Sequence, residues 1–94
     1  MNTIKHSLPV TEILAGLAEE ATELAHAALK LRRVFDGTNP TPKNEEEAIM
    51  DLWEEIADVK IYCSLLDVNP KEISRIMDEK INRWRERLMR RDAK

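Results

Sequence analysis

Two pairs of carboxylates have the residue types and the spacing that could do chemistry. Glu20 and Glu23 form the first pair, Glu55 and Asp58 form the second, and the members of each pair are three positions apart. Residues three apart on a helix lie on the same face, so each pair would direct its two carboxylates the same way. Antiparallel packing of the two helices would bring all four together, where they would repel by roughly a few kcal/mol per close pair. A bound divalent cation relieves such repulsion, so the pattern predicts a hard-metal site within a helical bundle.

Basic residues gather near the C-terminus. On the helix expected there, Lys80 lies at the edge of an apolar stripe, and Arg83 lies further round on the same side. An ionised group at the margin of a core is unfavourable unless it is paired, hydrated or bound to a ligand. The basic end and the acidic middle of the chain therefore indicate an anionic ligand held jointly by metal and cations. From position 80 onward the basic residues are Lys80, Arg83, Arg85, Arg87, Arg90, Arg91 and Lys94, against the acids Glu86 and Asp92.

The bulk properties of the chain limit its class. A length of 94 residues predicts one domain, 1–94, and a net charge of −3 argues against a general nucleic-acid binder. The single Cys63 excludes an internal disulfide and a zinc site built from several cysteines. Residues 1–9 lack the apolar core of a secretory signal, and no apolar run is long enough to span a membrane. We therefore expect a cytoplasmic protein with neither a membrane nor a nucleic acid as its partner.

The elements that must position these residues are helices. Apolar residues recur at helical spacing over 10–35, and no segment shows strand-like alternation. A second helix is expected to begin within 41–44 and to run to about position 67, and a third is expected over 70–91. Each would be roughly 35 Å long at 1.5 Å per residue. The predicted fold class is therefore all-α, with three long helices in an antiparallel bundle.

Particular residues mark the ends of these helices. Gly37 suits the left-handed position that ends a helix, and two prolines within 36–44 make that segment a loop. Residues 1–9 are expected to be loosely ordered. Two alternative caps are expected for the second helix: Asn44, with Glu47 three residues later, or Thr41 before Pro42. The third helix is expected to be capped by Asn69, which is followed by Pro70 and Glu72.

The second helix carries an additional row of apolar residues beside its main stripe. A helix that is apolar on two sides needs two packing partners. A chain of three helices offers few partners, so we expect homo-oligomerisation to complete the bundle. The additional row consists of Trp53, Ala57, Ile61 and Leu65.

Three segments of the chain match motifs of a known family. The pattern E-E-x-x-E … E-x-x-D is formed by LAEEATELA at 17–25 followed by EEIADV at 54–59. The pattern K-I-x-R is present in KINRW at 80–84. In these segments the chain resembles the MazG-like all-α nucleoside triphosphate pyrophosphohydrolases of the short phage and bacterial type. The similarity spans about 14–88. The two carboxylate motifs in this order, followed by a basic third helix, are a fairly specific sign of this family.

The resemblance implies hydrolysis of a (deoxy)nucleoside triphosphate between its α and β phosphates, giving monophosphate and pyrophosphate. It implies Mg²⁺, with Mn²⁺ as an alternative, and a homodimer or dimer of dimers whose sites are lined by helices from more than one subunit. Lys80 and Arg83 would contact the phosphates, although the basic motif can also be aligned on Asn82 or Arg87. The implied catalytic and metal-binding residues are Glu20, Glu23, Glu55 and Asp58.

Two other classes of function fit parts of the pattern. A non-catalytic helical dimerisation module would pair its carboxylates and cations in buried ion networks. A carboxylate bundle of the di-iron type is indicated by His26, which follows Glu23 as an E-x-x-H pair. For the pyrophosphohydrolase, Glu20 or Glu23 could accept the proton of the attacking water, and no residue specifies the base or sugar. Tyr62, Trp53 and Trp84 could stack a base, although packing is the commoner role for such residues.

Overall fold

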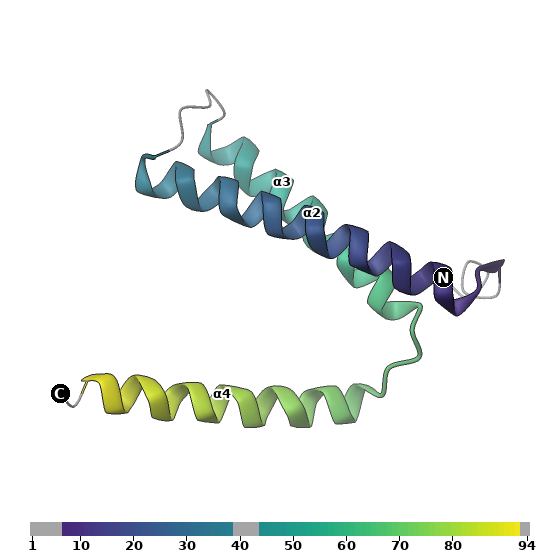
Figure 1. The fold of residues 1–94 in the computed structure, drawn as a ribbon. Coiled ribbons are helices and arrows are strands. Elements are labelled where there is room, and N and C mark those ends of the chain that lie inside the picture. The colour runs from purple at the N-terminus through teal and green to yellow at the C-terminus, as the bar shows by residue number, and fades with distance from the viewer. Residues whose placement is uncertain (1–6, 39–43, 93–94) are drawn as a thin grey trace.

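The computed structural model describes residues 7–38 and 44–92, and three long α-helices lie within these residues (Figure 1). In chain order they are α2 (Val10–Asp36), α3 (Glu45–Ser64) and α4 (Pro70–Asp92). The part of the chain so described contains no strand, which confirms the all-α prediction. None of these three helices is long and apolar enough to cross a membrane.

Predicted capping residues end α2 and begin α3. Gly37 follows α2 with a φ of 72°, and its N–H donates a hydrogen bond to the carbonyl of Arg33. The side-chain oxygen of Asn44 accepts a hydrogen bond from the N–H of Glu47 at 2.8 Å, and the Asn44 amide donates to the Glu47 carboxylate at 3.2 Å. This reciprocal pair is a capping box. The alternative cap, Thr41, lies outside the described residues.

The predicted cap of α4 is also confirmed, whereas α3 ends earlier than expected. The side-chain oxygen of Asn69 accepts hydrogen bonds from the N–H groups of Lys71 at 3.0 Å and Glu72 at 3.3 Å. α3 stops at Ser64 instead of continuing to about position 67. The next two N–H groups bond to carbonyls only three residues back, at 3.0 and 3.2 Å, and Asp67 has a φ of 21°. This backbone is a turn and cannot extend the helix.

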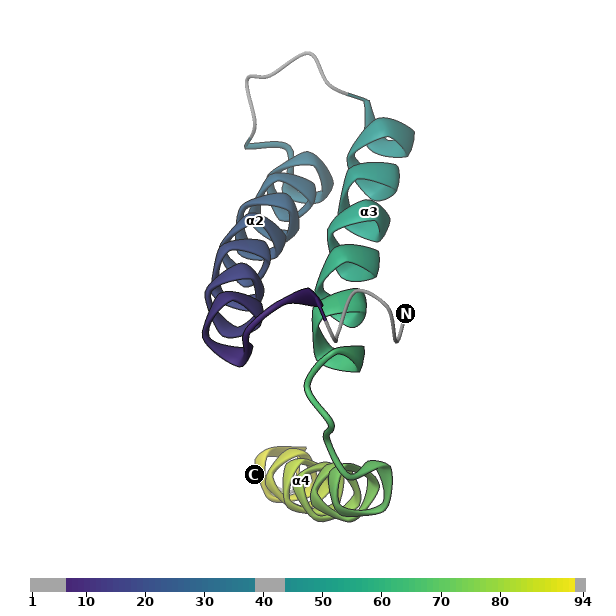
Figure 2. The ribbon, with the colours of Figure 1, turned by 90° about the vertical axis from the view of Figure 1, so that its right-hand side faces the viewer.

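α2 and α3 lie side by side and antiparallel, as Figures 1 and 2 show. The predicted loop at 36–44 joins them, and most of it, like most of the N-terminal segment 1–9, lies outside the described residues. The two helices bury a narrow strip of apolar side chains between them. Its buried members are Ile13, Ala27 and Leu31 from α2, Ala48 from α3, and Leu65 just beyond α3.

Gly16 marks a close approach of α2 and α3. A Cβ atom at this position would lie against the ring of Tyr62, 2.7 Å from its hydroxyl oxygen. A side chain at position 16 would therefore have to displace the tyrosine ring. The contact lies one helical turn from Glu20 on α2 and one turn from Asp58 on α3. It therefore brings the two helices together at the level of the predicted carboxylates.

We expect Gly16→Ala to lower the free energy of unfolding by up to about 2 kcal/mol. Alanine favours a helix over glycine by about 1 kcal/mol, but overpacking a helix contact disfavours the fold by about 1–3 kcal/mol. Urea unfolding of Gly16→Ala, alone and combined with Tyr62→Ala, measures the coupling between the two positions. In the Tyr62→Ala background the alanine should become stabilising. A stabilising effect in the wild-type background would contradict the close packing.

α4 packs against neither α2 nor α3. The described residues of those helices make no contact with it, and Figures 1 and 2 show α4 lying apart from the α2–α3 hairpin. All of its residues are exposed. The third helix of the predicted bundle is therefore not packed within one chain. Large apolar side chains remain exposed on α4 at helical spacing: Ile73, Ile76, Met77, Ile81, Trp84 and Leu88.

The additional apolar row predicted on the second helix is mostly exposed on α3. Trp53 is 59% exposed and Ile61 is 45% exposed, and Ala57 is exposed as well. Leu65 differs, because it lies in the turn after α3 and is buried in the core. The exposed members form part of an apolar surface of the kind that marks interaction sites. Oligomerisation itself stays a prediction.

Candidate functional site

Three of the four predicted carboxylates come together between α2 and α3. Glu20, Glu55 and Asp58 each offer one oxygen atom, and these atoms all lie within 4.8 Å of one another. These three half-buried residues form the carboxylate cluster. Glu23 is exposed and is not a member of this group. Of the two predicted pairs, both acids of the α3 pair but only one acid of the α2 pair therefore lie at the site.

The surroundings of Glu20 raise the pKa of its carboxyl group above the ordinary value. Burial is the largest cause, because it disfavours the charged form. The negative charges of Asp58 and Glu55 act in the same direction, and so does a hydrogen bond with Asp58. The charge of Glu23 adds a smaller contribution. Glu23 therefore acts on the cluster electrostatically, although it is not part of it.

The pKa of Glu55 is raised for the same reasons. Burial is again the largest cause, followed by the charges of Asp58 and Glu23, and then by those of Glu54 and Asp51. All of these contributions disfavour the ionised carboxylate. Sequence reasoning missed the part that Asp51 plays. Its position one turn before Glu55 was the available signal, because residues four apart share a helix face.

One oxygen of Glu55 lacks a partner. Its Oε2 atom is buried and has no hydrogen-bond partner among the residues that the structure describes. Within 7–38 and 44–92, no Lys or Arg forms an ion pair with a member of the carboxylate cluster. Buried polar atoms are nearly always satisfied, and buried charge is unfavourable without a counter-charge. The described part of the chain thus leaves the cluster without a counter-charge, and leaves one of its oxygen atoms without a hydrogen bond.

The donor atoms of the cluster suit a hard divalent cation. Mg²⁺ takes oxygen ligands at about 2.0–2.1 Å, so ligands on opposite sides of the ion are about 4.2 Å apart. The cluster oxygens, which lie within 4.8 Å of one another, are close to that span. An all-carboxylate donor set favours magnesium or manganese over softer metals. Glu20, Glu55 and Asp58 are therefore the residues that could hold such an ion.

His26 does not join the cluster. It is exposed on α2, and the candidate metal-binding group found among the described residues contains carboxylates only. The E-x-x-H pair of Glu23 and His26 is therefore not assembled with the other acids as a di-iron centre would require.

The predicted phosphate-binding cations lie on α4, away from the carboxylate cluster. Lys80 and Arg83 line a surface groove together with Trp84 and Arg87. Because α4 contacts neither α2 nor α3, a single chain does not bring these cations to the cluster. The predicted combination of acids and bases at one site is thus not formed between the described residues of one chain.

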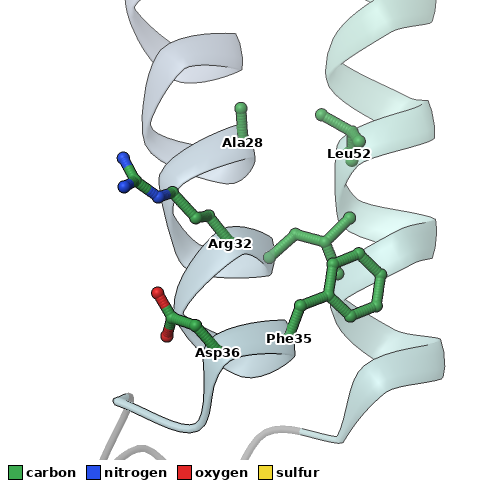
Figure 3. Close-up of a pocket in the computed structure, with 6 residues that line it drawn as sticks. Ala28, Arg32, Phe35, Asp36 and Leu52 are labelled. Carbon is green, nitrogen blue, oxygen red and sulfur yellow. The ribbon is translucent and has the colours of Figure 1, made fainter. Parts of the chain in front are cut away.

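A second groove lies between α2 and α3, near the C-terminal end of α2 (Figure 3). Phe35, which is 61% exposed, gives it an apolar wall. The carboxylate of Asp36 accepts hydrogen bonds from the N–H of Thr38 at 3.1 Å and from its hydroxyl at 2.6 Å, and these bonds lower the pKa of Asp36. No member of the carboxylate cluster lines this groove. Its lining residues are Ala28, Leu31, Arg32, Phe35, Asp36 and Leu52.

The raised pKa values predict how stability without metal depends on pH. The folded state holds protons on Glu20 and Glu55 more tightly than the unfolded state does, so their contribution favours folding at low pH. That contribution is lost as pH rises from the ordinary value of 4.5 through the raised values. Magnesium should therefore raise the melting temperature above this range and lose its effect below it, where protons compete for the carboxylates.

Thermal melts between about pH 4.5 and pH 8, with EDTA or with magnesium, measure this dependence. The double variant Glu20→Gln/Glu55→Gln is the control, because it removes both titrating groups while the other acids of the chain remain. Its melting temperature without metal should fall less with rising pH than that of the wild type. Identical profiles for the two proteins would contradict the predicted titration.

No protein-family model, curated protein or solved structure matches the chain. Function is therefore inferred from the residues and their geometry.

Proposed function

We propose that the chain is a magnesium-dependent nucleoside triphosphate pyrophosphohydrolase. It would cleave a (deoxy)nucleoside triphosphate between the α and β phosphates to give monophosphate and pyrophosphate. The observation that carries this proposal is the carboxylate cluster, with the buried Oε2 atom of Glu55 that has no partner among the described residues. The resemblance of the motifs at 17–25, 54–59 and 80–84 to the MazG-like enzymes supports the same reaction.

The metal would be held by the cluster acids Glu20, Glu55 and Asp58, joined by Glu23 from the next turn of α2. Magnesium, or manganese in its place, would screen the phosphate charges and make a water at the site more acidic. Glu23 already acts on Glu20 and Glu55 through its charge. Glu23 is exposed, so its side chain would have to turn toward the cluster to reach the ion.

The reaction is a hydrolysis in which a water oxygen bonds to the α-phosphorus. The bond from that phosphorus to the bridging oxygen breaks, and pyrophosphate departs with that oxygen. A carboxylate of the site takes the proton from the water. Glu20 or Glu23 would fill this role.

Lys80 and Arg83 would stabilise the charge that develops on the departing pyrophosphate. Because α4 contacts neither α2 nor α3, a second copy of the chain would supply these cations. The exposed apolar residues in the first half of α4, among them Ile73 and Met77, support packing of this helix on a partner's hairpin. The result would be an antiparallel helical bundle formed by a homodimer or dimer of dimers. We place it in the cytoplasm, where nucleotides and magnesium are available.

Product analysis tests the proposed bond cleavage. Each turnover should yield one nucleoside monophosphate and one pyrophosphate, resolved by ³¹P NMR or anion-exchange chromatography. Formation of a diphosphate and orthophosphate instead would place the attack at the γ-phosphorus and would contradict the proposal.

A non-catalytic dimerisation module is the second candidate. The observation that favours it is the exposed apolar stripe of α4, which would be covered in a dimer whether or not the protein is an enzyme. Such a module should assemble without turning over any nucleotide, and magnesium should leave its melting temperature unchanged.

A further inference from the structure

The surface groove on α4 combines one aromatic side chain with three cations. Trp84 lines it and is 64% exposed. Lys80 precedes it by four residues and Arg87 follows it by three, so both share its helix face, about 6 Å and about 4.5 Å away along the axis. Arg83 lines the same groove. The long side chains of these cations can therefore reach a ligand that lies on the indole.

The cations of this groove differ from other arginines of α4. Arg75 forms ion pairs with Glu72 at 3.0 Å and with Glu79 at 2.6 Å. Arg90 lies 3.5 Å from Glu86. By contrast, Lys80, Arg83 and Arg87 form no ion pair with any described residue. Among the described residues, three of the unpaired cations of the helix thus line one groove with an exposed tryptophan, whereas the unpaired Lys71 and Arg85 lie outside that groove.

This combination selects a particular kind of ligand. Three unpaired cations favour a multiply charged anion, whereas an exposed indole favours a flat, polarisable ring. A nucleotide has both features, and base–aromatic stacking is largely independent of base identity because every base has a π-face. A site of this kind would therefore accept several bases, with purines somewhat preferred because they stack more strongly.

We propose that Trp84 stacks on the base of a nucleoside triphosphate whose phosphates are bound by Lys80, Arg83 and Arg87. The choice of a triphosphate rests on the proposed function, whereas the stacking contact rests on the groove itself. Trp84 lies in the second half of α4, with the groove cations on one side and the exposed Ile81 and Leu88 on the other. The base is then held by a residue of α4 and not by the carboxylate cluster.

Fluorescence of Trp84 tests this proposal on the full chain. Trp53 is the only other tryptophan, so a Trp53→Phe background isolates the signal. EDTA removes divalent metal, and with it turnover. Under these conditions ATP should quench Trp84 emission, whereas inorganic tripolyphosphate should bind without comparable quenching, because it has no ring. Adenosine should quench only at much higher concentrations, because it lacks the phosphates.

Substitutions separate stacking from charge in a calorimetric titration. Trp84→Ala should weaken ATP binding by about fivefold to 100-fold and leave tripolyphosphate binding unchanged. Trp84→Phe should restore most of the loss. Lys80→Ala should weaken both ligands. Met89→Ala is the matched control, because it removes a 70% exposed side chain from the same helix without touching the groove.

Three outcomes would overturn the proposal. The first is ATP binding that neither quenches Trp84 nor depends on it. The second is a single-stranded oligonucleotide that binds far more tightly than ATP, which would identify the groove as a nucleic-acid surface. The third is Trp84 emission that changes on dilution, as subunits dissociate, but does not change when ATP is added. That result would show that a second copy covers Trp84.

These results are separable from those that bear on the proposed reaction. Trp84-dependent ATP binding without pyrophosphate release under any conditions would support the stacking site and contradict the enzyme. Pyrophosphate release that is unchanged in Trp84→Ala, in KM as well as in kcat, would support the enzyme and contradict the stacking site.

Discussion

Glu55→Gln should reduce pyrophosphate release by about 100-fold or more while leaving the protein folded. The substitution keeps the size of the side chain but removes the charge from the member of the carboxylate cluster whose Oε2 atom is buried. Loss of an outer-shell partner of a metal ligand already reduces affinity or activity by about 10- to 100-fold, and loss of a direct ligand should exceed that. Steady-state kinetics at saturating magnesium measure the effect.

Glu54→Gln is the matched control for this variant. It removes the same charge from the neighbouring residue, which is exposed and lies outside the cluster. Its activity should stay within a few-fold of that of the wild type. Equal losses in the two variants would mean that general negative charge, and not the cluster, supports the reaction.

The same Glu55→Gln variant should also be more stable than the wild type when metal is absent. Burial and neighbouring charges raise the pKa of Glu55, so the ionised carboxylate disfavours the folded state at neutral pH. A neutral amide removes that penalty and can donate hydrogen bonds to Asp58 or Glu20. Magnesium should then raise the melting temperature much less than it does in the wild type. A lower stability of the variant in EDTA would instead favour a structural ion network, as in the dimerisation module.

The second large effect is expected on α4. Lys80→Ala and Arg83→Ala should each reduce turnover by about 10²- to 10³-fold, the usual consequence of removing a group that stabilises charge in the transition state. Both variants should keep the magnesium-dependent rise in melting temperature, because neither residue contacts the cluster in its own chain. Lys71→Ala is the matched control, since it removes a cation of the same helix that lines neither of the grooves beside Trp84.

Mixing inactive variants tests whether α4 acts on a second copy. Glu55→Gln and the Lys80→Ala/Arg83→Ala double variant carry their defects on different helices. In an exchanging one-to-one mixture, about half of the dimers would be mixed, and each would contain one intact site. Activity should therefore recover to about one quarter of the wild-type rate. No recovery despite demonstrated subunit exchange would mean that α4 acts within its own chain.

Local features of the fold were predictable because they depend on neighbours in the sequence. Asn44, Asn69 and Gly37 act within a few residues of the backbone groups that they cap, and all three were identified from sequence. The end of α3 was placed too late, because the apolar pattern continues past Ser64 although the backbone does not. The turn there places Leu65 in the core.

The carboxylate cluster was predictable in type but not in every member. Helical spacing identifies which acids share a face, but the face that meets the other helix depends on packing. The close contact between Gly16 and Tyr62 lies on that face, and sequence alone does not pair those two residues. Glu20 consequently lies between the helices, whereas Glu23 is exposed.

The position of α4 could not be derived from its pattern. An amphipathic stripe shows that a helix has an apolar face, but the stripe is the same whether its partner lies in the same chain or in another. Ile73 and Met77 are exposed for this reason. The cations of α4 were recognised as a group, but their separation from the cluster was visible only in the structure.

The decisive measurement is pyrophosphate release by the wild-type protein from a panel of ribo- and deoxyribonucleoside triphosphates, with magnesium and with EDTA. Release from at least one nucleotide that requires magnesium or manganese, and that is abolished by Glu55→Gln, is the result we predict. Folded wild-type protein that releases no pyrophosphate from any nucleotide in the presence of magnesium would contradict the proposed function.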